Sequence, residues 1–354
     1  MSPLPLLRVE DLHTVFHTPH GDLHAVNGVS LTLRAGETLG IVGESGSGKS
    51  VLGRTVMGLI TQGSGTSVTG TVTLDGRDVH ALRPRERRRL WGPEVAMVFQ
   101  DPMTSLNPVK RVGTHLTEPL RVHLKAGRKE ARERALELLA QVGIPDPVRR
   151  LGQYPHELSG GMRQRVVIAM ALACGPRLLI ADEPTTALDV TVQKQILDLI
   201  ASLGERLDMA TVLISHDLAA VAGRADRVTV MYAGHTVESA PTGQLFHRPA
   251  HPYTEALLAS VPKLEAAPHT LLRAIEGQPP NMLRPPAGCR FAPRCAHADA
   301  VCEARMPQPE RRPGEESGDP GDAPGAPHLV ACHHPRDAAD PVPVSATEPT
   351  ESRT

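Results

Sequence analysis

Short apolar segments separated by polar turn residues run through the first hundred positions of the chain, and this pattern predicts β-strands. The predicted strands cover residues 6–12, 29–33, 38–42, 70–76 and 95–100. A helix is predicted from Lys49 to about Leu59, directly after the third strand. The arginine-rich run that begins at Pro84 is also predicted to be helical, with its charges in water.

A helical period replaces the strand pattern at residues 128–143. The apolar positions at i, i+3, i+4 and i+7 are Ala135, Leu138, Leu139 and Val142. This spacing places them on one face of an amphipathic helix. Because the helix interrupts a series of strands, we expect an inserted helical subdomain over about residues 101–160.

Helices and strands alternate after residue 160, a pattern typical of a parallel sheet covered by helices. The order is helix 162–174, strand 177–182, helix 190–207 and strand 211–215. The periodicity fades beyond about residue 246. The stretch 307–327 is rich in proline, glycine and acidic residues, so we expect a flexible or disordered loop there, and a disordered tail at 336–354.

Composition narrows the class of protein. The 354 residues are 40% hydrophobic, enough for a sizeable core, and the formal net charge is −1. Nothing in this balance argues for nucleic acid as a partner, and the 2% aromatic content weakens the case for a base-stacking surface; we expect no nucleic-acid partner. Neither a signal peptide nor a membrane-spanning run is expected, so we predict a cytoplasmic chain whose clustered cysteines bind a metal or do redox work.

One glycine-rich stretch fits the pattern G-x-x-x-x-G-K-[ST] between a predicted strand and a predicted helix. Its residues are Gly43, Glu44, Ser45, Gly46, Ser47, Gly48, Lys49 and Ser50. Glycines let backbone N–H groups face phosphate oxygens, and the helix adds its positive end. We expect Lys49 to reach the β- and γ-phosphates and Ser50 to bind magnesium, which predicts a nucleoside triphosphate site.

An apolar strand that ends in two acids, "RLLIADEP", predicts the second half of this site. Asp182 is expected to orient magnesium, directly or through water. Glu183 is the candidate general base for an attacking water. The alternative for Glu183 is an acid that only caps the next turn.

A second phosphate-binding motif precedes a long helix, at Ser159, Gly160 and Gly161. With this motif in its place, the chain resembles the ATPase subunits of ABC transporters over residues 6 to about 245. The motifs that carry the resemblance are the P-loop at 43–50, "VFQDP" at 98–102, "LSGGM" at 158–162, "LLIADEP" at 178–184, "TALD" at 186–189 and "ISHD" at 214–217.

The resemblance implies a P-loop NTPase fold of the α/β class, with a RecA-like core, an antiparallel β subdomain and the inserted helical subdomain. It also implies a head-to-tail dimer, in which Ser159 and Gly161 of one subunit close over the γ-phosphate held by Lys49 of the other. Asp189 would contact the P-loop across that dimer.

Two further roles follow from the same resemblance. Gln100 would contact magnesium and the lytic water and respond to the membrane partner. His216 would contact the γ-phosphate and hold the attacking water.

The aromatic residue that stacks on adenine in this family is not obvious here. Phe16 is the nearest candidate, but "HTPHGDL" at 17–23 is expected to lengthen the loop between it and the next strand. Core packing is the alternative role for Phe16. The chain lacks the N-K-x-D stretch by which many GTPases read guanine.

The C-terminal part, residues 246–335, resembles the extension of the oligopeptide, dipeptide and nickel importer ATPases. The segments that carry this likeness are 247–264 and 277–302. It implies pairing with a second, different ATPase subunit beneath two membrane permease subunits, at the cytoplasmic face of the membrane, with an extracytoplasmic solute-binding protein. Peptide is the expected solute and nickel or another small solute is the alternative. A soluble ABC ATPase and a metal-sensing regulator remain as other classes.

Four cysteines follow the spacing C-x₅-C-x₆-C-x₂₉-C in this extension, and we predict that they ligate one metal centre. They are Cys289, Cys295, Cys302 and Cys332. Structural zinc sites prefer closer cysteine pairs, which favours a [4Fe-4S] cluster over zinc, and clusters occur in some members of the subfamily. Unliganded or oxidised thiols are the alternative. Cys174 is expected to be a core residue.

Overall fold

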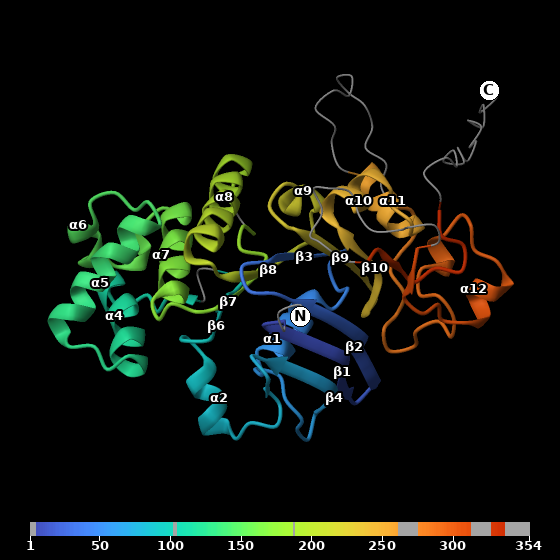
Figure 1. The fold of residues 1–354 in the computed structure, drawn as a ribbon, viewed down its shortest axis with the longest axis horizontal. Helices are drawn as coiled ribbons and strands as arrows, with labels where there is room; N and C mark the ends of the chain where they lie inside the picture. Colours follow the sequence, from blue (N-terminus) through green and yellow to red (C-terminus); the bar gives the residue numbers. More distant parts are fainter. Residues whose placement is uncertain (1–4, 102–104, 187, 261–274, 313–326, 337–354) are drawn as a thin grey trace, which may run out of the picture.

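The computed structural model describes residues 5–101, 105–186, 188–260, 275–312 and 327–336. Residues 313–326, which form most of the predicted flexible loop, and the predicted tail after 336 lie outside this description. Two sheets and a group of helices make up the fold (Figure 1). No helix among the described residues is both long and apolar enough to cross a bilayer.

A four-stranded antiparallel sheet contains most of the N-terminal strands. Its order is β2 (Gly21–Leu33), β1 (Leu7–Thr18), β4 (Thr66–Leu74) and β5 (Arg77–Asp78). β1 and β2 form a hairpin with Phe16 opposite Leu23, and only Pro19 and His20 lie between the strands. The long loop expected at 17–23 is therefore wrong, because these polar residues extend both strands as a solvent-exposed ribbon.

The central sheet has eight strands, of which five are parallel. The parallel strands are, in spatial order, β6 (Val95–Val98), β7 (Leu178–Asp182), β8 (Ala210–Ser215), β3 (Thr38–Val42) and β9 (Arg227–Tyr232). Three antiparallel strands continue it, namely β10 (His235–Pro241), β12 (Leu329–Val330) and β11 (Glu310–Arg311). The predicted parallel sheet is confirmed, and the carboxyl ends of its strands meet at one edge.

Helices cover both faces of this sheet and form a separate group at one end. α1 (Lys49–Val56) and α2 (Pro84–Leu90) lie in the N-terminal third, and the group at one end comprises α4 (Val112–His123), α5 (Arg128–Gln141), α6 (Pro147–Leu151) and α7 (Gly160–Leu172) (Figure 1). The remaining helices are α8 (Val190–Leu207), α9 (Leu218–Val221), α10 (Thr242–His247), α11 (Pro252–Ala259) and α12 (Ala300–Ala304). Two 3₁₀ turns are η1 (Pro155–Glu157) and η2 (Ala292–Arg294).

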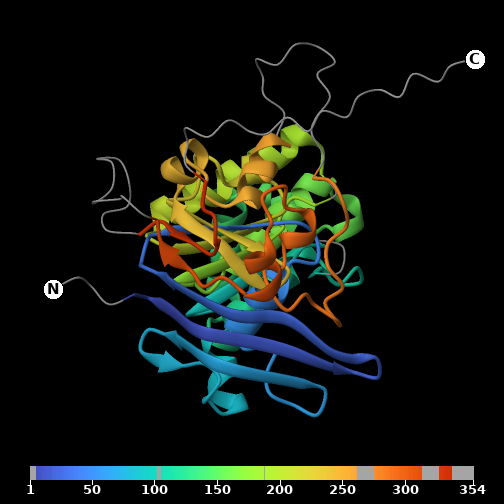
Figure 2. The same cartoon turned by 90° about the vertical axis from the view of Figure 1, so that its right-hand side faces the viewer.

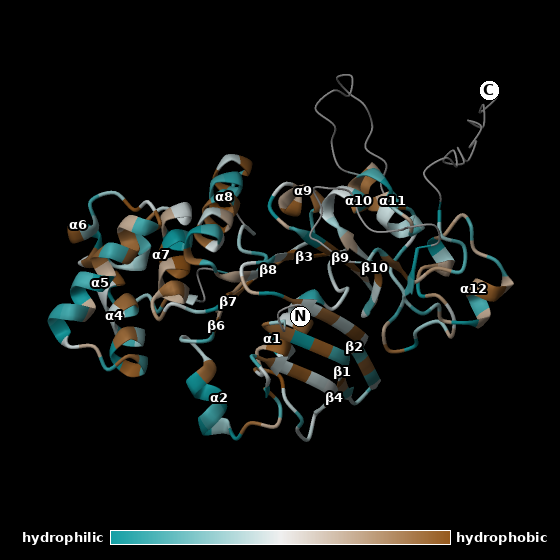
Figure 3. Ribbon diagram, in the orientation of Figure 1, coloured by the Kyte–Doolittle hydropathy of each residue, from teal (hydrophilic) through white to brown (hydrophobic). Residues whose placement is uncertain are grey.

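The apolar faces explain this layering. On β7, Leu178 and Ile180 pack into the core beneath the antiparallel sheet, whereas Leu179 and Ala181 face the helices on the other side. A strand buried on both faces is apolar at every position. On α5 the buried residues include Ala135, Leu138 and Leu139, as the helical period predicts. Brown apolar positions accordingly line the strands and the inner faces of α4 and α5, and the outer face of α5 is polar (Figure 3).

The C-terminal extension is held against the central sheet by hydrogen bonds to β10. The carboxylate of Glu238 on β10 is fully buried and accepts hydrogen bonds from the Ala250 and His251 amides, at 2.8 and 2.9 Å. It also bonds His328 at 2.7 Å, and the Ala331 amide donates to the Val237 carbonyl at 2.8 Å. Both ends of the extension are therefore fixed to β10, as the orange and red segments in Figure 2 illustrate.

Candidate functional site

The P-loop joins β3 to α1 and depends on glycine at two close approaches. Gly48 begins α1 with φ of 97°, and a Cβ there would clash with the Ala25 carbonyl. Gly43 has φ of 152°, and a Cβ there would clash with the Met231 carbonyl. Only glycine combines these left-handed angles with such close backbone contact. The predicted strand, loop and helix order is confirmed.

Lys49 is only 4% exposed and lies folded against its own loop. Its ammonium donates to the Gly43 and Glu44 carbonyls at 2.7 and 2.9 Å, and to Ser47 Oγ at 3.3 Å. Burial lowers the pKa of Lys49, while the nearby carboxylates of Glu183 and Asp182 oppose that shift. The lysine therefore places a partly desolvated positive charge at the loop. Phosphate oxygens could replace the carbonyl oxygens as acceptors of its N–H groups.

Ser50 and Asp182 meet although 132 positions separate them. The Ser50 hydroxyl donates to Asp182 Oδ1 at 2.7 Å. Asp182 is fully buried, and burial raises its pKa. Its other oxygen, Oδ2, has no hydrogen-bond partner among the described residues, and the nearest cation, Arg54, stands 3.9 Å away. A buried carboxylate oxygen with unused acceptor capacity beside a hydroxyl is a donor set that suits Mg²⁺.

Glu183 is the residue after Asp182, and three polar side chains donate hydrogen bonds to one of its carboxylate oxygens. Its Oε2 accepts hydrogen bonds from Gln100 at 3.0 Å, His216 at 3.2 Å and Thr186 at 3.2 Å. The hydrogen bond from His216 lowers the pKa of Glu183, so this carboxylate is ionised at neutral pH. Glu183 has a left-handed φ of 45°, a conformation that costs energy for a residue other than glycine.

The topology explains why these residues meet. Gln100, Glu183 and His216 follow the neighbouring parallel strands β6, β7 and β8, whose carboxyl ends share one edge of the sheet. The structure thus brings together all three residues that the sequence proposed for hydrolysis. Thr186 was missed, although its place just before "ALD" in the predicted motif could have drawn attention to it.

A cavity of about 300 Å³ opens beside the P-loop. Its lining includes Lys49, Ser50, Gln100 and Glu183, with Phe16 from β1 and Met282 from the extension. The structure therefore places Phe16 at the nucleotide cavity. Met282 was not expected there, and no local pattern could reveal it, because it lies more than 230 positions beyond the P-loop in the chain.

The Ser159 motif lies away from this cavity within one chain. Ser159 caps α7, where its Oγ accepts from the Met162 amide at 3.3 Å, and both Ser159 and Gly160 are exposed. Gly161 is half-buried, and none of the three residues lines the cavity. Asp189 caps α8 by accepting from the Val192 amide at 2.9 Å. One chain alone does not bring these residues to Lys49.

The four cysteines of the extension line one common pocket. They are Cys289, Cys295, Cys302 and Cys332, all as free thiols, and His251 lines the same pocket. Burial raises the pKa of Cys332 to about 12, and the neighbouring thiols act in the same direction. The predicted grouping of these cysteines is therefore present in the fold. Cys174 does not line this pocket and lies near Gly92; it is only half-buried, so the expected core position is not confirmed.

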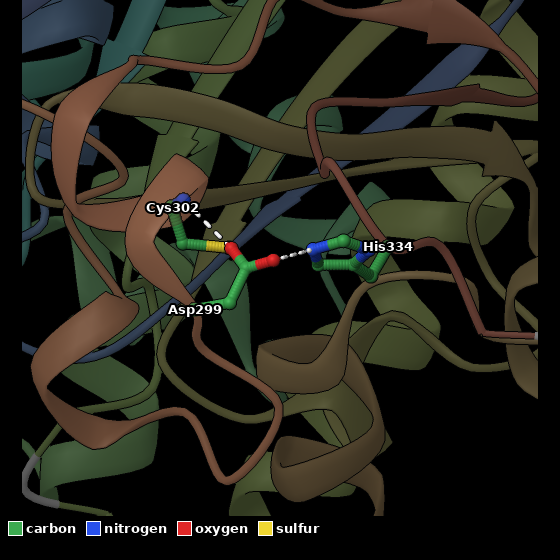
Figure 4. A group of neighbouring side chains, drawn as sticks. All are labelled: Asp299, Cys302 and His334. Carbon is green, nitrogen blue, oxygen red and sulfur yellow. Dashed lines mark hydrogen bonds and ion pairs between the residues drawn. The ribbon is translucent and has the colours of Figure 1, made fainter.

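Asp299 organises one wall of the cysteine region (Figure 4). Its carboxylate caps α12 by accepting from the Val301 and Cys302 amides, at 3.1 and 3.0 Å, and its other oxygen bonds His334 at 2.9 Å. These bonds fix Cys302 relative to the segment that carries Cys332. Among the described residues, Asp299, Cys302 and His334 are the only trio of possible metal ligands whose ligand atoms lie within 4.8 Å of one another.

Comparisons with known proteins relate both halves of the chain to one class of protein. The ABC transporter family matches residues 26–186, and the C-terminal region of oligopeptide/dipeptide transporters matches residues 237–302. The oligopeptide transport ATP-binding protein OppD of Escherichia coli is 50% identical over 309 residues, which cover 87% of this chain and 91% of that protein. OppD of Bacillus subtilis is 52% identical over 83% of this chain and 82% of its own length. DppD of Bacillus subtilis, a dipeptide transport ATP-binding protein, is 49% identical over 85% of this chain and 90% of its own length.

Solved structures agree with the fold. Two dimeric structures of the ATP-binding cassette MJ0796 match with a TM-score of 0.60 and 27% identity, over 67% of this chain and 98% of theirs. One is described as a post-hydrolysis state bound to ADP and Pi, and the other as a bacterial ABC transporter cassette.

Proposed function

Because the chain belongs to the ATP-binding subunits of oligopeptide and dipeptide ABC transporters, we propose that it hydrolyses ATP to drive peptide import. The observation that carries the proposal is the meeting of Lys49, Ser50 and Asp182 with Glu183 at one edge of the sheet, in a chain 50% identical to OppD along most of its length. The P-loop residues 43–50 would hold the phosphates of ATP, and Phe16 would pack against the adenine.

Ser50, Asp182 and Gln100 would hold Mg²⁺. Oδ2 of Asp182 supports this role, since it accepts no hydrogen bond from the described residues and its nearest cation, Arg54, stands 3.9 Å away. When bound, Mg²⁺ would neutralise charge that develops on the β- and γ-phosphate oxygens. Lys49 would donate to the same oxygens in place of its present carbonyl partners.

Glu183 would act as the general base. Its lowered pKa keeps the carboxylate ready to accept a proton from a water that attacks the γ-phosphorus, while the bond to the β-phosphate oxygen breaks and ADP leaves. His216 and Gln100, which now bond the same Oε2, would hold that water on the correct side of the carboxylate. Thr186 would fix the carboxylate itself.

A second ATPase subunit would complete the site. Ser159, Gly160, Gly161 and Asp189 are remote from Lys49 in one chain, and the similar cassette MJ0796 is described as a dimer. We propose a head-to-tail pair in which these residues of one subunit face the nucleotide of the other, with a different ATPase as partner. The pair would sit peripherally at the cytoplasmic face of the membrane, beneath two permease subunits, with an extracytoplasmic binding protein that delivers the solute.

Reconstitution into lipid vesicles tests the transport function. The full chain would be assembled with its permease subunits, its partner ATPase and the binding protein, and ATP hydrolysis would be measured with di- and oligopeptides or with Ni²⁺. Peptide stimulation without stimulation by Ni²⁺ is expected. Stimulation by Ni²⁺ alone would contradict peptide as the solute while leaving the ATPase assignment intact.

The cysteine pocket would hold a [4Fe-4S] cluster. Four thiolates around one zinc at a Zn–S distance of about 2.3 Å lie roughly 3.8 Å apart. No three of the four sulfurs here lie within 4.8 Å of one another, so they are not gathered closely enough for a single zinc. Bound there, the cluster would supply a one-electron redox couple. Zinc is the alternative occupant.

His251 gives an independent sign that this pocket is built for a group that accepts a hydrogen bond. It is 1% exposed, and burial lowers its pKa to about 4, so the ring is neutral. Its Nδ1 accepts from the Tyr253 amide at 3.0 Å, which leaves the proton on Nε2. Nε2 has no partner among the described residues. His251 lines the cysteine pocket, and a cluster sulfur within reach of this N–H would satisfy it; such bonds tune the potential of iron–sulfur centres.

A further inference from the structure

The C-terminal extension contacts the P-loop directly through a paired charge. Arg294, in η2, donates from both terminal nitrogens to the carboxylate of Glu44, at 2.7 and 3.0 Å. Glu44 is the second residue of the P-loop, and 250 positions separate it from Arg294. Bidentate arginine–carboxylate pairs are among the stronger and more directional hydrogen-bonded contacts in proteins.

The guanidinium of Arg294 is held rigidly. Its side chain is 4% exposed and donates further hydrogen bonds to the Tyr232 hydroxyl at 3.1 Å and to the Glu276 and Ile275 carbonyls at 2.8 and 3.1 Å. It also lies over the ring of Phe291, 5.9 Å from the centroid. A guanidinium fixed on so many sides serves as an immobile anchor for the residue that it binds.

A second contact holds the backbone of the same P-loop residue. The Glu44 amide donates to the hydroxyl of Tyr253, on α11, at 2.8 Å. Tyr253 is fully buried, and its ring packs against Tyr232 at 4.6 Å between centroids. The extension therefore holds Glu44 at both its side chain and its N–H, and the Glu44 carbonyl is one of the acceptors of Lys49.

The charge of Glu44 is unfavourable for the proposed ligand, because a carboxylate in a phosphate-binding loop repels a nucleoside triphosphate. The Glu44 carboxylate acts electrostatically on Lys49, so a negative charge there opposes phosphate binding unless a counter-charge is fixed beside it. Arg294 supplies that counter-charge. Its bonds also keep the loop in one conformation, which reduces the ordering that ATP binding would otherwise require.

We propose that Arg294 of the C-terminal extension is a positioning residue for ATP binding, which neutralises Glu44 and holds the P-loop in its binding conformation. The extension then contributes directly to the nucleotide site. Arg294 binds the Glu44 carboxylate, and Lys49 binds the Glu44 carbonyl. The inference rests on the ATPase function alone and requires neither a particular solute nor a metal in the cysteine pocket.

The test measures the affinity of the full chain for a non-hydrolysable ATP analogue, together with its melting temperature. Arg294→Gln is expected to weaken binding by about tenfold, the effect of about 1.4 kcal/mol, through loss of a charge-assisted pair. Glu44→Gln in the same chain is expected to recover most of that loss, because the unneutralised charge is gone. A purely structural role for Arg294 would lower the melting temperature without such recovery.

Three controls keep the outcomes distinct. Arg177→Gln removes a comparable bidentate pair with Asp75 on the surface, and should leave analogue affinity unchanged. Lys49→Ala should abolish binding, and if the parent chain fails to bind the analogue at all, the nucleotide site itself is refuted. If Arg294→Gln does not fold, Arg294→Lys serves as the second variant, because it keeps the positive charge. It should weaken binding by about threefold through loss of the bidentate geometry.

Affinities within twofold of the parent for both Arg294 variants, or no recovery with Glu44→Gln, would overturn the proposal.

Discussion

His216 bonds Glu183 through its Nδ1 at 3.2 Å, across the carboxyl ends of β7 and β8. With Glu183 ionised, the ring N–H donates and the carboxylate accepts. The same bond raises the pKa of His216 and lowers that of Glu183. The proposed base and the histidine that would hold the attacking water therefore stabilise each other's charge.

The pair should therefore make stability depend on pH. The raised pKa of His216 gives a contribution that is complete below its ordinary value of 6.5 and lost as pH rises through the raised value. The lowered pKa of Glu183 gives a contribution that is complete above 4.5 and lost as pH falls through the lowered value. Both contributions are therefore complete between pH 4.5 and pH 6.5. The effect should be below about 1 kcal/mol, because His216 is largely exposed.

Melting temperatures without nucleotide check this window. The difference between the parent and His216→Gln should be larger at about pH 5.5 than at about pH 8.5. His20→Gln, in the exposed turn of the β1–β2 hairpin, serves as the control and should show no such difference. Equal effects of His216→Gln at both pH values would contradict the mutual stabilisation.

Glu183→Gln should keep nucleotide binding but reduce ATP turnover by roughly 10²- to 10⁴-fold, the usual contribution of a positioned general base. Because the amide cannot take the proton from water, the variant should also trap an ATP-bound dimer. Phosphate release and size-exclusion chromatography with ATP measure the two effects. Glu205→Gln, an exposed change at the end of α8, should leave both unchanged. Turnover within twofold of the parent would remove Glu183 from the role of base.

Asp182→Asn should have opposite effects on stability and on function. Asp182 is fully buried, one of its oxygens accepts no hydrogen bond from the described residues, and burial raises its pKa, so its charge destabilises the fold near neutral pH. We expect the variant to be more stable by on the order of 1 kcal/mol, yet to lose magnesium-dependent ATP binding. Asp208→Asn, an exposed change at the end of α8, should do neither. Magnesium-dependent binding equal to that of the parent would rule out a role for Asp182 at the metal.

The cysteine pocket predicts a coloured protein. Chain purified without oxygen should be brown, with about four iron and four sulfide per chain, and Cys295→Ser should bleach it. Cys174→Ser, outside the pocket, should leave the colour unchanged. Replacement of His251 by leucine should lower the reduction potential, since it removes an N–H donor from the sulfur surroundings. Colourless anaerobic protein with one zinc, or with no metal, would refute the cluster while leaving the ATPase function intact.

The sequence by itself determined the parts of this protein whose signals are local. A P-loop is defined by glycines and a lysine within eight positions, and a buried parallel strand by a short apolar run, so the α/β class and the P-loop fold could be predicted. The resemblance to ABC transporter ATPases, which the order of the motifs carries, associated Gln100 and His216 with Glu183. Parallel strands carry residues that follow them to one edge, and β6, β7 and β8 do so here.

Only the tertiary structure decided what the extension does. Arg294, Tyr253 and Met282 reach the nucleotide cavity or its loop because the extension is fixed to β10 through the buried carboxylate of Glu238. Such contacts join residues about 210 to 250 positions apart, and side-chain spacing along a chain carries no information at that range. The strand β12 has only two residues, which are too few to show a hydrophobic pattern. It forms because it pairs with the exposed edge of β10.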